Sequence, residues 1–507
     1  MGATPVAVMP PVAWHEVVHL RPAELRLRIE RMPEATWSRD PAALLGLAMA
    51  HRSPGSTNPY AAEPYLDAAD ELLADGVGEP ALHVLAPIVR SIPLRELGAF
   101  DQARGLLACA ARELSAARLP FAARVELQAV ILLNDGICAT LGGRLDEGRR
   151  TLLRALHLAE SRTPATLQAE ACGCIALIDL RTGSLRSAVA HLTTARSAAG
   201  GSGPIRDLGS APVRLAEIAV AMDRGQVDRL EAELSSLIAE TAGTEYEPLV
   251  LAELAALREA ADDDDAIDVL QELQLLIRDW DAPNLPRMMH DDTRIALLVR
   301  RHEAVAARAE LAGILPDETH TQCPATWSAR LALDGGAPAH AIELVAPCLA
   351  MGDAHSPRTA TLARLIAAAA HAVLGDLSTA DALFAQAISV AAPTGSVRQF
   401  GVVPRGQLSL LVARSRRVGH TAPVRALLDA IAARFPTGDD GASDTLSTRE
   451  RVVLARLVAG DTQQRISFEL SVSPNTVKTQ VRSIYRKLGV TTRDGAVHRA
   501  RSLGIID

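Results

Sequence analysis

A glycine recurs at intervals of about 40 residues along much of this chain, and this spacing constrains the fold more than any other feature. The intervals are 45, 40, 42 and 39 residues. A leucine follows each glycine after eight or nine positions, and a small residue usually follows after five. The intervening residues are rich in Ala, Leu and Arg, with apolar positions at helical spacing. The six glycines are Gly98, Gly143, Gly183, Gly225, Gly336 and Gly375.

The glycine pattern predicts an all-α fold in which a helical hairpin is repeated. Each glycine ends a helix, the small residue lets two helices approach closely, and the leucine packs on the next hairpin. The array resembles a tetratricopeptide-type (TPR-like) solenoid, although its period exceeds the standard repeat of about 34 residues. The 111-residue gap from Gly225 to Gly336 has room for three more units. The turns at Asp262–Asp265 and Arg300–Arg301 fall where two of the turns of these units belong.

The same pattern divides the chain into segments. We expect a helical-repeat sensor or interaction domain over residues 61–434, preceded by an N-terminal helical cap, residues 1–60, that prolines divide into short helices. Residues 435–445 are turn formers without apolar periodicity, which predicts a flexible linker. A non-repetitive helical bundle is the alternative architecture for the array.

Charge is distributed unevenly between the array and the C-terminal tail. Residues 446–507 hold 11 Lys and Arg against 5 Asp and Glu, which is a formal charge of +6. Because the whole chain has a formal charge of −8, residues 1–445 carry −14. The chain has only two lysines, Lys478 and Lys487, and both lie in this tail. A basic tail on an acidic body is typical of a phosphate-binding module joined to a part that does not bind nucleic acid.

The sequence of the tail predicts four helices between residues 446 and 507. Ser447 and Glu450 have the spacing of a capping box, and Gly460 ends the first helix. Asp461 or Thr462 caps a short second helix, whose inward residues are Ile466 and Leu470. Ser473 caps a third helix that starts at Pro474 and is closed by Gly489, and the fourth helix runs from Arg493 to Leu503.

The third helix is strongly two-sided. Its apolar stripe consists of Val477, Val481, Ile484 and Leu488, and its opposite face carries Asn475, Lys478, Thr479, Arg482 and Arg486. The major groove of DNA admits a helix, where Arg and Lys donate to guanine and Thr meets a base edge or a thymine methyl group. The pattern therefore indicates a DNA-reading helix, whereas a basic face alone would indicate only solvated surface.

These residues resemble the LuxR-type helix-turn-helix domain over about 62 residues. The resemblance rests on Leu446-Ser-Thr-Arg-Glu450, Gly460, Ile466, Leu470-Ser-Val-Ser-Pro-Asn-Thr-Val-Lys-Thr-Gln480 and Ile484-Tyr-Arg-Lys-Leu-Gly-Val490, with the helix-turn-helix unit at about 465–484. It implies that Lys478, Thr479 and Arg482 contact bases in the major groove. It also implies phosphate contacts from Thr462, Gln463, Thr476, Gln480, Arg486 and Lys487.

The resemblance further implies dimerisation through the fourth helix, on which Ala496, Val497 and Ala500 form a face of small residues. Three positions depart from the family pattern. Arg465-Ile466-Ser467 stands in place of Glu-Ile-Ala, Gln480 replaces a His, and Gly495 replaces the Glu that completes a capping box with Thr492. By helix propensity and cap loss together, the Gly495 replacement is expected to weaken the fourth helix by about 1–2 kcal/mol.

The array resembles the sensor region of the large MalT-like LuxR regulators, which often carry an ATPase module. A phosphate-binding P-loop needs a lysine, and no lysine precedes Lys478. We therefore expect no ATPase module, and no alternating β/α pattern indicates a receiver domain.

Enzymatic and metal-binding motifs are weak. His15-Glu16-Val17-Val18-His19 fits the HExxH zinc-peptidase pattern, with Glu24 or Glu30 as a conceivable third ligand, but Pro22 should end that helix. Cys172 and Cys174 lack partners for a metal site, the six cysteines are typical of buried thiols, and Asp262–Asp265 lacks the spacing of a calcium loop. We expect no catalytic residue, no metal and no cofactor.

The sequence favours a cytoplasmic, bacterial DNA-binding transcriptional regulator that is not an enzyme. Its expected partners are double-stranded DNA, a small-molecule or protein effector on the array, a second copy of the chain on DNA, and RNA polymerase. No membrane contact is expected, because no signal peptide is evident and no apolar run reaches the roughly 18 residues of a membrane span. The alternatives are a helical-repeat scaffold with a vestigial tail and, third, a zinc peptidase.

Overall fold

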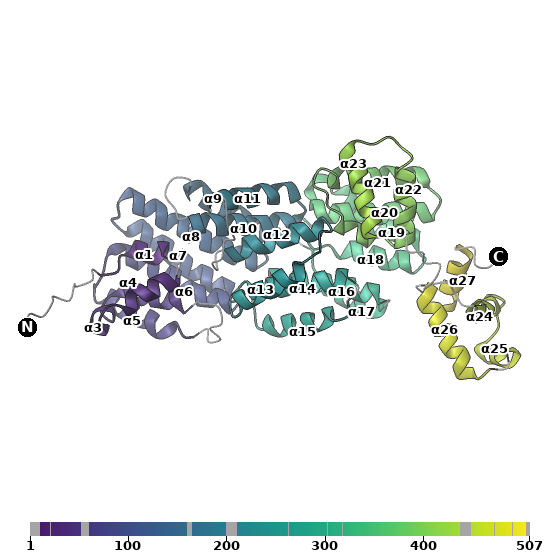
Figure 1. The fold of residues 1–507 in the computed structure, drawn as a ribbon, viewed down its shortest axis with the longest axis horizontal. Coiled ribbons are helices and arrows are strands. Elements are labelled where there is room, and N and C mark those ends of the chain that lie inside the picture. Colours follow the sequence, from purple (N-terminus) through teal and green to yellow (C-terminus); the bar gives the residue numbers. More distant parts are fainter. Residues whose placement is uncertain are drawn as a thin grey trace, which may run out of the picture. The chain divides into compact units, whose positions relative to one another are not determined.

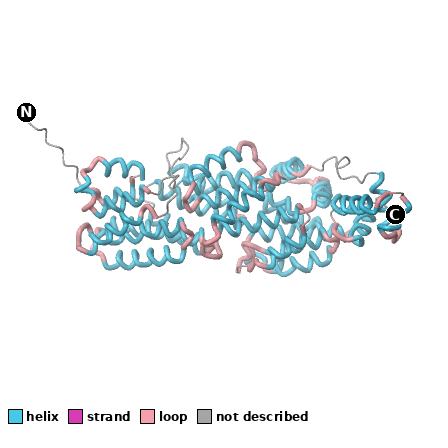
Figure 2. Tube along the Cα trace, turned by 90° about the horizontal axis from the view of Figure 1, so that it is seen from below, coloured by secondary structure: helices cyan, strands magenta, loops and turns pink. Residues whose placement is uncertain are grey.

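The computed structural model is all-helical in the residues that it describes (Figures 1 and 2). Those residues are 11–20, 22–51, 60–159, 165–198, 210–261, 263–301, 303–316, 318–436, 448–470, 472–488 and 490–502. They confirm the all-α prediction. The chain divides into two compact units: the first comprises Met1–Arg181, Leu185–Ala221 and Val227–Thr293, and the second comprises Thr182–Ser184, Met222–Gln226 and Arg294–Asp507.

The first unit begins with short helices, as the prolines predict. Helix α4 is held at its start by Asp40, whose carboxylate accepts hydrogen bonds from the backbone N–H groups of Ala42 (3.0 Å) and Ala43 (3.4 Å). Gly46 lets α4 approach α2 closely, because a Cβ there would lie 2.8 Å from the Leu25 side chain. The short helices share one apolar core with the helices that follow. They are α1 (Trp14–His19), α2 (Pro22–Glu30), α3 (Glu34–Trp37), α4 (Pro41–Ala50) and α5 (Glu63–Ala74).

Longer helices then follow one another in antiparallel succession (Figure 1). They are α6 (Pro80–Glu96), α7 (Phe100–Ala116), α8 (Phe121–Leu141), α9 (Leu145–Ala159), α10 (Ala165–Thr182), α11 (Leu185–Ala198), α12 (Ala211–Asp223), α13 (Leu230–Thr241), α14 (Glu247–Ala260), α15 (Ala266–Leu276) and α16 (Leu285–Arg300).

All six periodic glycines lie at turns between helices, as predicted. Each has a positive φ, between 73° and 96°, which a side-chain-free residue adopts without strain. Five of them are followed two residues later by the first residue of a helix. After Gly225, helix α13 starts only at Leu230, and Arg229 at its N-cap also adopts a left-handed conformation, with φ of 69°. The glycine period therefore marks the hairpin turns.

The predicted spacing of the close contacts is also confirmed. Ala103, Ala188, Ala341 and Ala380, each five residues after a periodic glycine, are fully buried. The gap between Gly225 and Gly336 contains helices α13 to α18, which is the helix content of three further units. The turns between α14 and α15 and between α16 and α17 lie at the two predicted places, although Asp262 itself is outside the described residues.

The second unit contains a further helical core and the C-terminal helices. Phe384 and Phe400 pack edge to face within that core, with ring centroids 6.0 Å apart. The helices of this unit before the C-terminal ones are α17 (Ala304–Ala312), α18 (Pro324–Asp334), α19 (Pro338–Ala350), η2 (Gly352–Ala354), α20 (Pro357–Val373), α21 (Leu377–Ala391), η3 (Arg398–Val402), α22 (Arg405–Ser415) and α23 (Ala422–Arg434). The last four helices are α24 (Thr448–Val458), α25 (Gln463–Glu469), α26 (Pro474–Leu488) and α27 (Arg493–Ser502).

The predicted limits of cap, array, linker and tail stay predictions, and most of the linker lies outside the described residues. None of the described helices is long and apolar enough to cross a membrane.

Candidate nucleic-acid interface

The C-terminal helices enclose a small core of their own. The predicted stripe of α26 is buried: Val477 and Ile484 are fully covered, and Val481 and Leu488 nearly so. It packs against Val453, Leu454 and Leu457 of α24, Ile466 of α25, and Ala496 and Ala500 of α27. The helical period of α26 therefore points its apolar side inward and leaves the opposite side to solvent.

The second and third helices begin near the predicted residues. The Thr462 hydroxyl accepts a hydrogen bond from the N–H of Arg465 (3.3 Å), so Thr462 rather than Asp461 is the N-cap of α25. Helix α26 starts at Pro474, and the N–H of Val477 donates to the carbonyl of Ser473 (3.2 Å). In the turn between the two helices, Leu470 is partly buried, as expected for an inward residue.

Glu450 has a role that the sequence did not reveal. The predicted capping box pairs it with Ser447, which lies outside the described residues. The structure buries Glu450, and its carboxylate accepts a hydrogen bond from the Ser483 hydroxyl (2.7 Å). This bond joins α24 to α26 over a separation of 33 residues. Only the packing of the two helices brings these side chains together.

Arg493 is a second side chain that sequence reasoning missed. Its guanidinium donates twice to the carbonyl of Leu457, at 2.6 and 3.1 Å. The C-terminus of α24 has carbonyl groups without partners inside the helix, and a cation is favourable there. Arg493 therefore fastens the start of α27 to the end of α24.

The predicted base-reading residues lie on the exposed side of α26. Lys478, Thr479 and Arg482 are all exposed. Among the residues that the structure describes, Lys478 and Arg482 take part in no hydrogen bond or ion pair of their side chains. Two cations one helical turn apart are thus available to an acceptor from outside the chain.

The predicted phosphate-contact residues are only partly described. Thr462 and Gln463 are exposed at the start of α25, and Gln480 on α26 is partly exposed. The side chains of Thr476, Arg486 and Lys487 lie outside the described residues.

The departure at Arg465 changes the local charge pairing. Arg465 pairs with Asp461 (3.3 Å), which lies just before α25, and with Glu469 (3.2 Å), one turn further along the helix. These two carboxylates hold the pKa of Arg465 above its usual value, with the Glu469 hydrogen bond as the largest cause. Ser467 donates to the carbonyl of Gln464 (2.7 Å). The positive charge that Arg465 brings in place of the family's acid is therefore balanced by two nearby carboxylates.

Two of the three residues expected to form a dimer face are covered by the domain itself. Ala496 and Ala500 are fully buried in the domain's own core, which closes them to a second copy in this conformation. Val497 is partly exposed. The first turn of α27 is capped in spite of Gly495, because the Thr492 hydroxyl accepts a hydrogen bond from the Gly495 N–H (3.1 Å).

The residues of the HExxH motif make other contacts. Helix α1 ends at His19, which pairs with Glu126 of α8. Glu16 accepts from the N–H of Ala13 (2.9 Å) and pairs with Arg28 (2.8 Å). Burial raises the pKa of Glu16, but the Ala13 N–H and Arg28 outweigh it and hold that pKa below its usual value. A carboxylate paired in this way is a poor general base.

Comparison with known proteins identifies the C-terminal helices. Residues 444–500 match the family described as bacterial regulatory proteins, luxR family. The probable transcriptional regulatory protein NarL of Mycobacterium tuberculosis, in strains CDC 1551 / Oshkosh and ATCC 25618 / H37Rv, is 47% identical over 62 residues. The match covers 12% of this chain and 29% of each relative's length. The C-terminal domain of this protein is therefore a helix-turn-helix domain of the luxR family of bacterial regulatory proteins.

Proposed function

We propose that this protein is a DNA-binding transcriptional regulator whose helix α26 reads promoter DNA in the major groove. The observation that carries the proposal is the exposed face of α26, where Lys478 and Arg482 lie opposite the buried stripe in a luxR-family domain. Arg and Lys donate to guanine O6 and N7, and Thr479 on the same face meets a neighbouring base edge.

Phosphate contacts position the helix in the groove. We assign them to Thr462, Gln463, Thr476, Gln480, Arg486 and Lys487. The exposed positions of Thr462 and Gln463 at the start of α25 support this assignment, because a helix N-terminus presents free N–H groups to a phosphate. Contacts of this kind fix the register of the protein on DNA and carry no sequence information directly.

The remaining parts of the proposal concern control. The helical array receives a small-molecule or protein signal, and two copies of the chain occupy one operator, where RNA polymerase is a further partner. The process takes place in the cytoplasm, and catalysis forms no part of it. The array has apolar cores of its own, made of other residues than the core of the C-terminal helices, and this supports a receiving role for it. A ligand that acts through the array will change the operator affinity of the full chain.

The test uses full-length protein and a pool of genomic DNA fragments. We expect selective enrichment of some fragments, with an affinity that falls steeply as salt rises, because binding releases counterions from the phosphates. Two chains should bind each enriched site. Arg417→Ala, which removes an exposed arginine from the array, is the matched control and should bind as the wild type does.

Two results would refute the proposal. One is the absence of binding to any fragment, which would favour an interaction scaffold. The other is binding that does not change between low and high salt.

A further inference from the structure

Two cysteines and two histidines of the second unit converge on one point. They are His320, Cys323, Cys348 and His355, and each offers one ligand atom within 4.8 Å of the other three. The two cysteines and His355 are buried, and His320 is partly buried. The residues come from the segment before α18, from the N-cap of α18, from α19 and from the residue after η2 (helices labelled in Figure 1). Within the described residues, this is the group of side chains that could hold a metal ion.

The distances between these atoms match a tetrahedral metal site. The two sulfurs are 3.5 Å apart, and the His320 Nδ1 atom lies 3.7 Å from Cys323 Sγ and 3.8 Å from Cys348 Sγ. Zinc bonds of about 2.3 Å to sulfur and 2.0–2.1 Å to nitrogen place the ligand atoms of a tetrahedral site roughly 3.4–3.8 Å apart. The His320 and His355 rings are also adjacent, with centroids 5.0 Å apart.

His355 supplies an independent indication. Its side chain is almost completely buried, with 2% of its surface exposed, and its Nε2 atom has no hydrogen-bond partner among the described residues. Its Nδ1 atom lies 3.2 Å from the Ser356 carbonyl and 3.1 Å from the Thr359 hydroxyl. A proton on Nδ1 that donates to the carbonyl leaves a lone pair on Nε2, which is the arrangement found behind most histidine ligands. A buried ring nitrogen without a partner is unfavourable unless something binds it.

The backbone around the cluster is held in place. The Thr359 hydroxyl donates to the carbonyl of His320 (2.6 Å), and the N–H of Ser356 donates to the carbonyl of Thr319 (2.6 Å). His320 adopts a left-handed conformation, with φ of 52°, which is unfavourable for a residue other than glycine. Two hydrogen bonds thus fix the segment before α18 against the start of α20 and keep His320 beside the sulfurs.

The ligand set favours zinc. Two sulfurs and two imidazole nitrogens in tetrahedral arrangement are typical of structural zinc. Cys323 stands at the N-cap of α18, where the positive end of the helix dipole stabilises a thiolate, the form that binds metal. A disulfide between Cys323 and Cys348 would use the sulfurs but would leave the buried Nε2 of His355 without a partner.

We propose that His320, Cys323, Cys348 and His355 bind one zinc ion in a closed, structural site within the helical array. Four protein ligands leave no open position, so the ion has no catalytic role. It joins the segment before α18 to the connection between α19 and α20. This site is independent of the DNA-reading face and of the HExxH motif.

The first experiment measures metal in the full-length protein purified under reducing conditions without chelator. Elemental analysis should give close to one zinc per chain. Cys348→Ser and His355→Gln should lose it. Cys172→Ser, which alters a buried cysteine of α10, and His371→Gln, which alters a histidine paired with Asp376, should keep it. Thr359→Val removes the hydroxyl behind two of the ligands and should weaken zinc affinity about 10- to 100-fold.

The second experiment uses only the wild-type protein, so it does not depend on whether a variant folds. The wild-type protein is stripped with a chelator, reduced, and titrated with Co²⁺. A site with two thiolates should give the thiolate-to-cobalt charge-transfer absorption and the intense visible bands of a tetrahedral centre at one equivalent. Re-added zinc should displace the cobalt and abolish the spectrum.

Three results would overturn the proposal. The first is wild-type protein that, after reduction, takes up neither zinc nor cobalt. This result counts against the proposal also where mass spectrometry had found a Cys323–Cys348 disulfide in the protein before reduction. The second is stoichiometric iron or copper in place of zinc. The third is zinc that persists in both Cys348→Ser and His355→Gln.

Discussion

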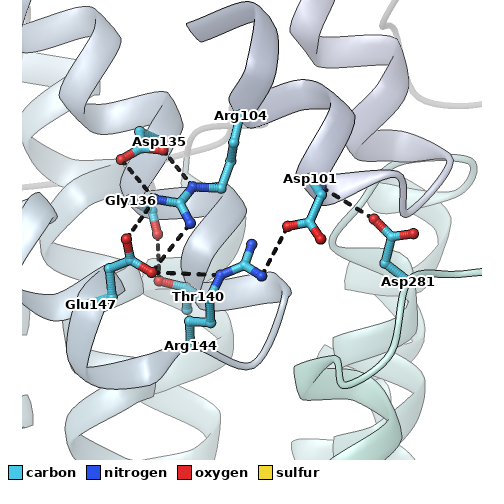
Figure 3. Close-up of polar contacts among 8 residues, drawn as sticks. All are labelled: Asp101, Arg104, Asp135, Gly136, Thr140, Arg144, Glu147 and Asp281. Carbon is cyan, nitrogen blue, oxygen red and sulfur yellow. Dashed lines mark hydrogen bonds and ion pairs between the residues drawn. The ribbon is translucent and has the colours of Figure 1, made fainter. Parts of the chain in front are cut away.

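The array and the exposed side of helix α26 use basic residues in opposite ways. In the array, arginines pair with carboxylates of neighbouring helices, as Figure 3 shows for Arg104, which contacts Asp135 and Glu147 at 2.6 Å each. Arg144 in the same network pairs with Asp101 (3.0 Å). On α26, Lys478 and Arg482 face solvent, and no ion pair among the described residues includes them.

The extreme case in the array is Arg95. It is 1% exposed, and its guanidinium contacts Glu245 (2.7 Å) and Asn134 (2.7 Å), residues far from it in sequence. A buried charge requires a partner, whereas an exposed one does not. Arg95 and Arg104 of the array therefore serve the fold, whereas Lys478 and Arg482 of α26 are available for binding.

The largest effect is expected at the buried pair. Arg95→Ala should lower the free energy of unfolding by about 3–5 kcal/mol, because it leaves the Glu245 carboxylate buried without its cation. Urea unfolding followed by circular dichroism measures the loss. Arg90→Ala is the control: Arg90 pairs with Asp67 and Asp70 at a partly exposed position, where about 1 kcal/mol or less is at stake. Equal losses in the two variants would contradict the prediction.

The next effect concerns Asp179, which joins three consecutive helices. Its carboxylate pairs with Arg149 of α9 (2.8 Å) and His191 of α11 (3.2 Å). Burial raises the pKa of Asp179, but the hydrogen bonds from His191, Arg149 and Ser187 outweigh it and lower the pKa below its usual value. Asp179→Asn should therefore destabilise the protein by about 1.5–3 kcal/mol at neutral pH, since it removes hydrogen bonds to a charged group.

The pH dependence of that effect has a definite sign. A carboxyl group with a lowered folded-state pKa stabilises the protein above its unfolded pKa of about 3.9, and this stabilisation is lost as the pH falls through the folded value. The difference in stability between wild type and Asp179→Asn should thus shrink as the pH is lowered below about 4. A difference that stays constant down to acid unfolding would show that the charge of Asp179 does not matter.

On the DNA-reading side, Arg482→Ala should weaken operator binding by about 1–3 kcal/mol and relax the preference for one base pair. The free energy of unfolding of the Arg482→Ala variant should stay within about 0.5 kcal/mol of the wild-type value, because the Arg482 side chain is exposed. Lys478→Ala should have the same two effects on operator binding and on stability. Fluorescence anisotropy with matched and mutated operators measures the first effect. A loss of stability without a loss of DNA affinity would reverse the roles of the two regions.

The smallest effect is expected at the start of α27. Thr492→Ala removes the hydroxyl that accepts from the Gly495 N–H and should ease the opening of this helix by about 1 kcal/mol. Hydrogen exchange of the α27 amides measures the opening. Thr491→Ala, at the neighbouring exposed position, should leave exchange unchanged. If both variants exchange alike, the Thr492 cap does not hold the helix.

Local patterns in the sequence predicted most of the helical architecture. The periodic glycines anticipated the hairpin turns, and the stripe from Val477 to Leu488 anticipated the buried side of α26. Both succeed because they depend on interactions within one turn or one helix: a left-handed turn favours glycine, and a helix repeats every 3.6 residues whatever surrounds it.

The same local reasoning could not predict which small residues of α27 would be buried by other helices of the domain. Ala496 and Ala500 have the spacing of a dimer face, yet α24 and α26 bury them. Helical spacing identifies residues that share a face but does not say whether that face meets the chain itself or a second copy. Glu450 with Ser483, and Arg493 with Leu457, were missed for the same reason.

The tertiary structure alone brought together the most distant groups. Arg95 and Glu245 are separated by 150 residues, and His320, Cys323, Cys348 and His355 lack the paired CxxC or HxxxH spacing by which zinc ligands are recognised in a sequence. The sequence by itself determined where helices begin, end and turn their apolar sides, because those properties are local. Which charges and ligands meet was decided by helix packing, because contacts between distant segments exist only once the hairpins have stacked.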